Sequence, residues 1–167
     1  MKKLFLSVLM ALGIMACSET EPEQYTGQEL SYDLFKASDY DFTGRLTVKE
    51  LVGGQLEFNL RLNGPKATSD YSYPAHFHFG SYDQADAAIA YMLSPVSAKS
   101  LESVTVLGKL SDGTTLSFEE MKFFDGHIKV HLAGEGPDYQ VILVAGNVGG
   151  NLSEFNPEDL AICGNRF

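Results

Sequence analysis

The segment Gln55-Leu56-Glu57-Phe58-Asn59-Leu60-Arg61-Leu62 alternates polar and apolar residues without a break. Because successive side chains of a β-strand point to opposite faces, this pattern puts leucine and phenylalanine on one buried face. The segment Arg45-Leu46-Thr47-Val48-Lys49 precedes it, and a turn containing Gly53-Gly54 separates the two. Together they predict a β-hairpin that turns one face toward a hydrophobic core.

Further segments of strand-like composition occur along the chain, and Gly, Pro, Asn and Asp separate them at nearly regular spacing. They are residues 30–36, 73–79, 87–93, 103–107, 127–132 and 140–145. With the hairpin they make eight short strands in one domain, which indicates an all-β fold, either an antiparallel sandwich or a barrel.

One short helix is expected near residues 117–124. Ser117 is followed three residues later by Glu120, the spacing of a capping box, in which each side chain binds the backbone N–H of the other residue. The pattern therefore predicts one or two helical turns at the end of the β-domain.

The N-terminus resembles the signal peptide of a bacterial lipoprotein. Lys2 and Lys3 are followed by an apolar run that is too short to span a bilayer, and Ile14-Met15-Ala16-Cys17 has the form of a lipobox. This resemblance implies that residues 1–16 are removed and that Cys17 receives acyl chains such as palmitate. The protein would then be anchored to a membrane by lipid and would not span it.

Residues 17–28 read as the lipidated cysteine and a flexible acidic tether, and residues 29–167 as a single β-domain. Ser18, directly after the cysteine, favours the outer membrane of the cell envelope. Glu19, Glu21 and Glu23 resemble a surface-export signal, although acidic tethers also serve solubility alone. The sequence leaves open whether the domain faces the periplasm or the outside.

The net charge of the chain limits the classes of partner that it can bind. Without Lys2 and Lys3, the remaining basic residues face 22 acidic residues, so the mature net charge is about −12. Such a surface repels nucleic acid, and no nucleic-acid partner is expected.

Acylation of Cys17 would leave Cys163 as the only thiol, which excludes an intramolecular disulfide.

The four histidines form two pairs at strand spacing. His76 and His78 share one face of their strand, and His127 and His131 share one face of theirs, with Lys129 between them. If the two strands are neighbours, four imidazoles converge on one face, where they suit a single copper or zinc ion. The alternative is that these histidines are hydrogen-bonding residues without a metal. The lysine favours that alternative because a cation opposes a bound metal ion.

At these residues the chain resembles the CHRD domain, a domain found in many bacterial lipoproteins. The resemblance covers about residues 44–151 and includes Ala75-His76-Phe77-His78, Ser94-Pro95-Val96, Val130-His131 and Val148-Gly149-Gly150-Asn151. It implies a single antiparallel Greek-key-like β-sandwich of immunoglobulin-like or superoxide-dismutase-like character, without established enzymatic activity. His76, His78 and His131 fall on histidine positions of the family. His127 falls where an aromatic residue is more usual.

A more distant resemblance is to copper/zinc superoxide dismutase, through His76-Phe77-His78 and Gly146-Asn147-Val148-Gly149. The two-metal site of that enzyme needs more histidines than the four in this chain, so a dinuclear dismutase is excluded. No nucleophile elbow, phosphate-binding loop or His-Glu-x-x-His helix is present. We therefore expect a non-enzymatic binding or structural module of the cell envelope, with a mononuclear histidine-ligated copper or zinc protein, with or without redox activity, as the alternative.

Overall fold

The computed structural model describes residues 24–151 and 153–162 as an antiparallel β-structure with very little helix. The eight strands agree with the eight that the sequence predicts, with ends shifted by a few residues. They are β1 (Tyr25–Lys36), β2 (Thr43–Leu51), β3 (Leu56–Asn63), β4 (Ser72–Phe79), β5 (Ile89–Ser97), β6 (Glu102–Val106), β7 (Asp125–His131) and β8 (Ile142–Gly149).

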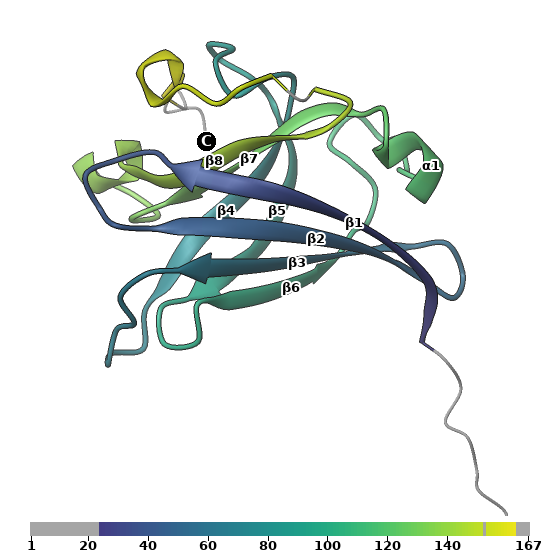
Figure 1. Cartoon of the computed structure of the whole chain (residues 1–167), viewed down its shortest axis with the longest axis horizontal. Helices are drawn as coiled ribbons and strands as arrows, with labels where there is room; N and C mark the ends of the chain where they lie inside the picture. Colours follow the sequence, from purple (N-terminus) through teal and green to yellow (C-terminus); the bar gives the residue numbers. More distant parts are fainter. Residues whose placement is uncertain (1–23, 152, 163–167) are drawn as a thin grey trace, which may run out of the picture.

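All eight strands belong to one sheet in the order β5-β4-β7-β8-β1-β2-β3-β6, which curls until it is nearly barrel-shaped (Figure 1). Strand β1 joins the two parts of the sheet, because it pairs with β2 up to Leu34 and with β8 at Phe35 and Lys36. The terminal strands β5 and β6 approach each other, and the Ser94 amide donates to Thr105 Oγ1 at 2.8 Å. The curl leaves both edges of the sheet facing one another.

The core lies inside the curl and is built by the alternating strands. On β3, Leu56, Phe58, Leu60 and Leu62 are all at most 3% exposed, as their period of two predicts. The ring of Phe58 meets the ring of Phe77 from β4 with centroids 5.3 Å apart. The two parts of the sheet are therefore held together by apolar contacts across the interior.

Two local features confirm the sequence interpretation. Gly53 and Gly54 both have positive φ in the turn between β2 and β3, a conformation that glycine adopts without steric cost. The helix α1 (Phe118–Met121) begins after Ser117, and Ser117 and Glu120 form the expected capping box. Two 3-10 turns, η1 (Pro137–Gln140) and η2 (Pro157–Asp159), complete the described elements.

Strand β1 begins at Tyr25, within the segment that the sequence predicts to be tether. Tyr25 pairs with Leu51 at the end of β2, and the register shifts between Tyr25 and Glu29. Tertiary contacts explain the difference. The Tyr25 hydroxyl donates to Glu57 at 2.9 Å, and both Thr26 and Gln28 donate to the Glu50 carboxylate. These partners are more than twenty residues away in the sequence, so local composition could not indicate them.

The signal peptide, Cys17 and Cys163 lie outside the described residues. Their lipidation and thiol predictions therefore remain predictions. Among the described helices, none has the length and apolar character needed to cross a membrane.

Phe77 is fully buried, whereas Phe123 is 80% exposed, so the two phenylalanines form a matched pair for a stability test. We expect Phe77→Ala to lower the free energy of unfolding by about 3–5 kcal/mol, because it leaves a cavity where the two parts of the sheet meet. Phe123→Ala should change it by less than about 0.5 kcal/mol. Urea unfolding curves measure both, and equal effects would contradict the position of the core.

Candidate functional site

The sequence predicts a candidate site at the four histidines, and the structure places all four on two neighbouring strands. His76 and His78 lie on β4, His127 and His131 lie on β7, and β4 pairs with β7 in antiparallel register. His78 stands opposite His127, and their rings stack at 4.7 Å. His76 and His131 meet with ring centroids 4.9 Å apart. The expectation that the two strands are neighbours is confirmed.

This histidine cluster (His76, His78, His127 and His131) is sealed from solvent. Each of its side chains is at most 1% exposed, and so is that of Lys129. The outer faces of β4, β7 and β8 are covered by the connections after β4 and β7 and by the C-terminal segment. The Lys129 ammonium donates to the Ala161 carbonyl of that segment at 2.6 Å.

Backbone carbonyls of the covering segments orient three of the imidazoles. The Nδ1 atoms of His127 and His131 lie 2.7 Å from the Gly80 and Tyr139 carbonyl oxygens, and that of His78 lies 3.1 Å from the Ala87 oxygen. A carbonyl oxygen only accepts, so each Nδ1 carries the proton and each Nε2 carries a lone pair. These bonds tie the loops to the sheet, which gives the histidines a structural role.

The cluster is held in its neutral form. Burial lowers the pKa of His76 and of His78 to about 3, and the neighbouring imidazoles contribute to both shifts. Burial also lowers the pKa of His127 to about 4 and lowers that of His131. The Lys129 cation acts in the same direction on all four, because it opposes a second positive charge nearby.

The cluster does not present a metal site in the described part of the chain. No group of three or more His, Cys, Asp or Glu side chains there is arranged to hold a metal ion. Two imidazole nitrogens, His76 Nδ1 and His127 Nε2, are buried without a hydrogen-bond partner among the described residues. The geometry thus offers isolated nitrogen atoms but no three-ligand set.

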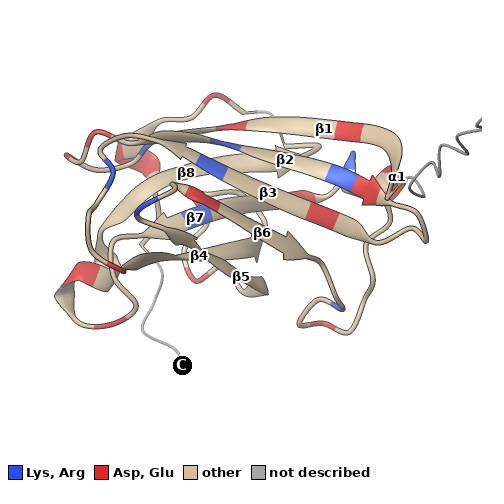
Figure 2. Cartoon of the chain, turned by 90° about the horizontal axis from the view of Figure 1, so that it is seen from below, with Lys and Arg blue, Asp and Glu red and all other residues tan. Residues whose placement is uncertain are grey.

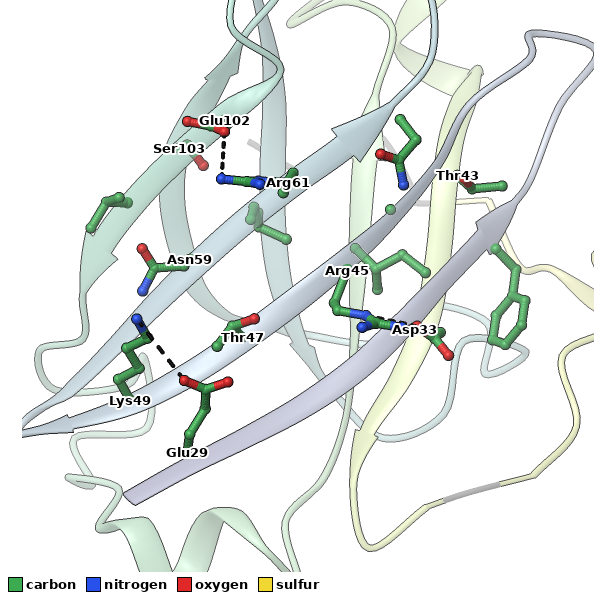
Figure 3. A pocket seen from close by; sticks show the side chains of 16 residues that line it. Glu29, Asp33, Thr43, Arg45, Thr47, Lys49, Asn59, Arg61, Glu102 and Ser103 are labelled. Atoms are coloured by element: carbon green, nitrogen blue, oxygen red, sulfur yellow. Dashed lines mark hydrogen bonds and ion pairs between the residues drawn. The ribbon is translucent and has the colours of Figure 1, made fainter. Parts of the chain in front are cut away.

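The outer face of β1, β2, β3 and β6 is open, in contrast to the covered face of the histidines. It carries a polar recess of about 780 Å³ between side chains of these four strands (Figure 3). Acidic and basic residues lie side by side on β1, β2 and β3 (Figure 2). The polar side chains that line the recess are Glu29, Asp33, Thr43, Arg45, Thr47, Lys49, Asn59, Arg61, Asn63, Glu102 and Ser103.

Strand register orders the charges of the polar recess into a row. Asp33 pairs with Arg45, Arg45 stands opposite Arg61, and Arg61 pairs with Glu102. Arg45 donates to Asp33 Oδ1 through Nε at 3.0 Å and Nη2 at 2.7 Å, and Arg61 Nη2 lies 2.8 Å from Glu102 Oε1. The row therefore reads acid, base, base, acid across four strands.

Sequence reasoning singled out none of the recess residues as a site. Arg45, Thr47, Asn59 and Arg61 are among the polar residues of the two hairpin strands, and the alternation predicts only that they lie on the outer face. Pairing the hairpin strands through their glycine turn would have brought Arg45 near Arg61. Nothing local indicated that this face stays open while the histidine face is covered.

Comparison of the chain with protein-family models, with curated proteins and with solved structures found no match. The site is therefore interpreted from its own geometry.

The buried histidines predict a loss of stability in mild acid. Their pKa values are lower in the folded chain than the ordinary value of about 6.5, so the unfolded chain takes up protons first. The stability that depends on the neutral histidines is fully present above about pH 6.5. It is lost as the pH decreases toward the pKa values that these histidines have in the folded chain. Each extra proton bound by the unfolded state costs about 1.4 kcal/mol per pH unit.

Urea unfolding between pH 7 and pH 5 measures this loss, in a range where carboxylates contribute little. His76→Gln should reduce the slope of stability against pH relative to the wild type, whatever it does to stability at pH 7. A slope that is the same in both proteins would contradict the neutral state of the cluster.

Proposed function

We propose that this chain is a non-enzymatic binding module of the cell envelope, held at the membrane by lipid on Cys17, which binds its ligand in the polar recess. The observation that carries the proposal is the contrast between two polar faces. The histidine face is sealed to at most 1% exposure, whereas the face of β1, β2, β3 and β6 is open and hollowed. Of these two faces, as the described residues form them, the one of β1, β2, β3 and β6 is accessible to a ligand from solution.

The chemistry of the polar recess supports binding more than catalysis. Its acids and bases pair with one another, as in Arg45–Asp33 and Arg61–Glu102, and its remaining polar residues are uncharged amides and hydroxyls. The recess contains no histidine or cysteine. A general base needs a pKa near the working pH, and histidine is the side chain whose ordinary pKa lies there.

The proposal also includes the type of β-fold and the domain family. The curled sheet is a Greek-key sandwich related to the CHRD domain, and the strand order supports this. Strands β3 and β6 are neighbours although two strands lie between them in the sequence, and so are β4 and β7. Such returns to an earlier strand characterise Greek-key connections.

A mononuclear copper or zinc protein is the weaker candidate. The unpartnered nitrogens of His76 and His127 favour it, since buried polar atoms without partners call for an explanation. Lys129 and the missing third ligand among the described residues oppose it.

Filling the recess tests the proposed function. Thr47 lies in the recess and Thr68 is exposed outside it, so Thr47→Tyr and Thr68→Tyr are matched variants. Both should keep the wild-type fold, because tyrosine is well tolerated on the outer face of a strand, where Thr47 lies, and Thr68 is exposed in the connection between β3 and β4. In a panel of immobilised oligosaccharides and peptides, Thr47→Tyr should lose the binding that the wild type shows. Equal binding by both variants would place the site elsewhere.

The two cysteines test the anchor. We expect Cys17→Ala to leave the membrane fraction and to incorporate no labelled palmitate, because it removes the acylated sulfur. Cys163→Ala should remain in the membrane fraction with its label. Palmitate labelling of intact cells followed by fractionation measures both, and a membrane-bound, labelled Cys17→Ala protein would refute lipidation at this residue.

A further inference from the structure

The central pair of the recess, Arg45 and Arg61, breaks a local rule of sheet structure. Residues directly opposite on neighbouring strands have Cβ atoms about 4.5–5.5 Å apart, and like charges in that arrangement are destabilising. Arg45 and Arg61 stand directly opposite. Arg45 leans toward β1 and Arg61 toward β6, each to its own acid, so that the recess opens between them (Figure 3).

Stability of the fold does not explain this arrangement. The side chains of Arg45 and Arg61 are 60% and 71% exposed, and ion pairs at such positions contribute only about 0–1 kcal/mol. Two threonines in place of the arginines would suit the strands equally well and would remove the repulsion. The arginines are thus better explained by a ligand than by folding.

Asparagine in the middle of β3 is a second exception on the same face. Asparagine is depleted in strands, yet Asn59 lies in the middle of β3 and lines the recess, where its amide donates to Glu57 Oε1 at 2.9 Å. Asn63, the last residue of the strand, also lines the recess. Thr43 stands opposite Asn63, and Thr47 stands opposite Asn59, so neutral hydrogen-bonding pairs lie on both sides of the arginine pair. Exceptions to local preference are expected at functional sites.

We propose that the polar recess binds a polysaccharide through one acidic sugar, whose carboxylate lies between Arg45 and Arg61 while neutral sugars lie over the flanking Thr–Asn pairs. This inference rests on the proposed binding function and names its ligand class. Arg45 Nε and Nη2 already donate to Asp33, so the ligand carboxylate accepts charge-assisted hydrogen bonds from the remaining guanidinium N–H groups of the two arginines. Threonine and asparagine supply donors and acceptors to sugar hydroxyls.

The surrounding acids limit the charge of the ligand. Glu29, Asp33 and Glu102 line the recess, and the whole chain carries a net charge of −10. A densely charged polyanion would be repelled by these carboxylates, whereas one carboxylate between two arginines is attracted locally. Isolated acidic sugars between neutral ones meet this condition.

The test uses the full-length protein in detergent and a trisaccharide with a central glucuronic acid between two neutral hexoses. The matched probe is the same trisaccharide with its carboxyl group reduced to an alcohol. Calorimetric titration should show that reduction weakens binding by about tenfold or more. Arg45→Ala and Arg61→Ala should each weaken binding of the acidic probe to a similar extent. Lys99→Ala, which removes an ion-paired cation outside the recess, should leave it unchanged.

The thermal unfolding midpoint of each variant separates lost binding from lost structure, and Arg45→Lys and Arg61→Lys keep the charge without the guanidinium group. Equal binding of both probes, or tighter binding of a glutamate-containing peptide, overturns the inference. The wild type and the arginine variants could bind other ligands equally well while Thr47→Tyr does not bind them. That result would support the proposed binding function and would overturn the acidic sugar as the ligand. If nothing binds in the recess, both fail.

Discussion

The two-residue period of the strands is the constraint on which this structure depends. Once a sheet of eight strands curls upon itself, one side of every strand enters a closed interior, and only an apolar set of side chains can fill it. Phe58 and Phe77 meet there from opposite parts of the sheet. The same period places the arginines of the hairpin and the four histidines on the outer faces of the sheet, whether or not a ligand binds there.

The two outer faces then have different fates. Over β4, β7 and β8 the covering segments turn the outer face into a second interior, in which neutral imidazoles donate to the carbonyls of those segments. Burying polar groups is tolerated there because most of them are hydrogen-bonded. Over β1, β2, β3 and β6 nothing comparable intervenes among the described residues, and the polar row stays in contact with solvent. The histidine cluster is thus buried and hydrogen-bonded to the covering segments, whereas the polar residues of the hairpin line an open recess.

The elements that the sequence predicted well are those with strong local signals. The hairpin followed from the alternation of Leu56 to Leu62 and from Gly53-Gly54, and the helix followed from the Ser117–Glu120 capping box, because each signal acts within a few residues. The start of β1 was wrong because its stabilising partners, Glu50 and Glu57, belong to other strands. The exposure of the candidate site could not be predicted for a related reason: residue type indicates which side chains can bind, and only the packing of distant segments shows that the four histidines are buried.

By itself, the sequence determined the positions of the strands, the apolar face of each, and the placement of the histidines on one side of their strands, since these depend on side-chain period and turn residues. Only the tertiary structure decided that β4 lies beside β7, that Arg45 stands opposite Arg61 between two acids, and that one polar face is covered while the other is open. These features arise from pairing and packing between residues far apart in the chain, where the free energy depends on which surfaces meet.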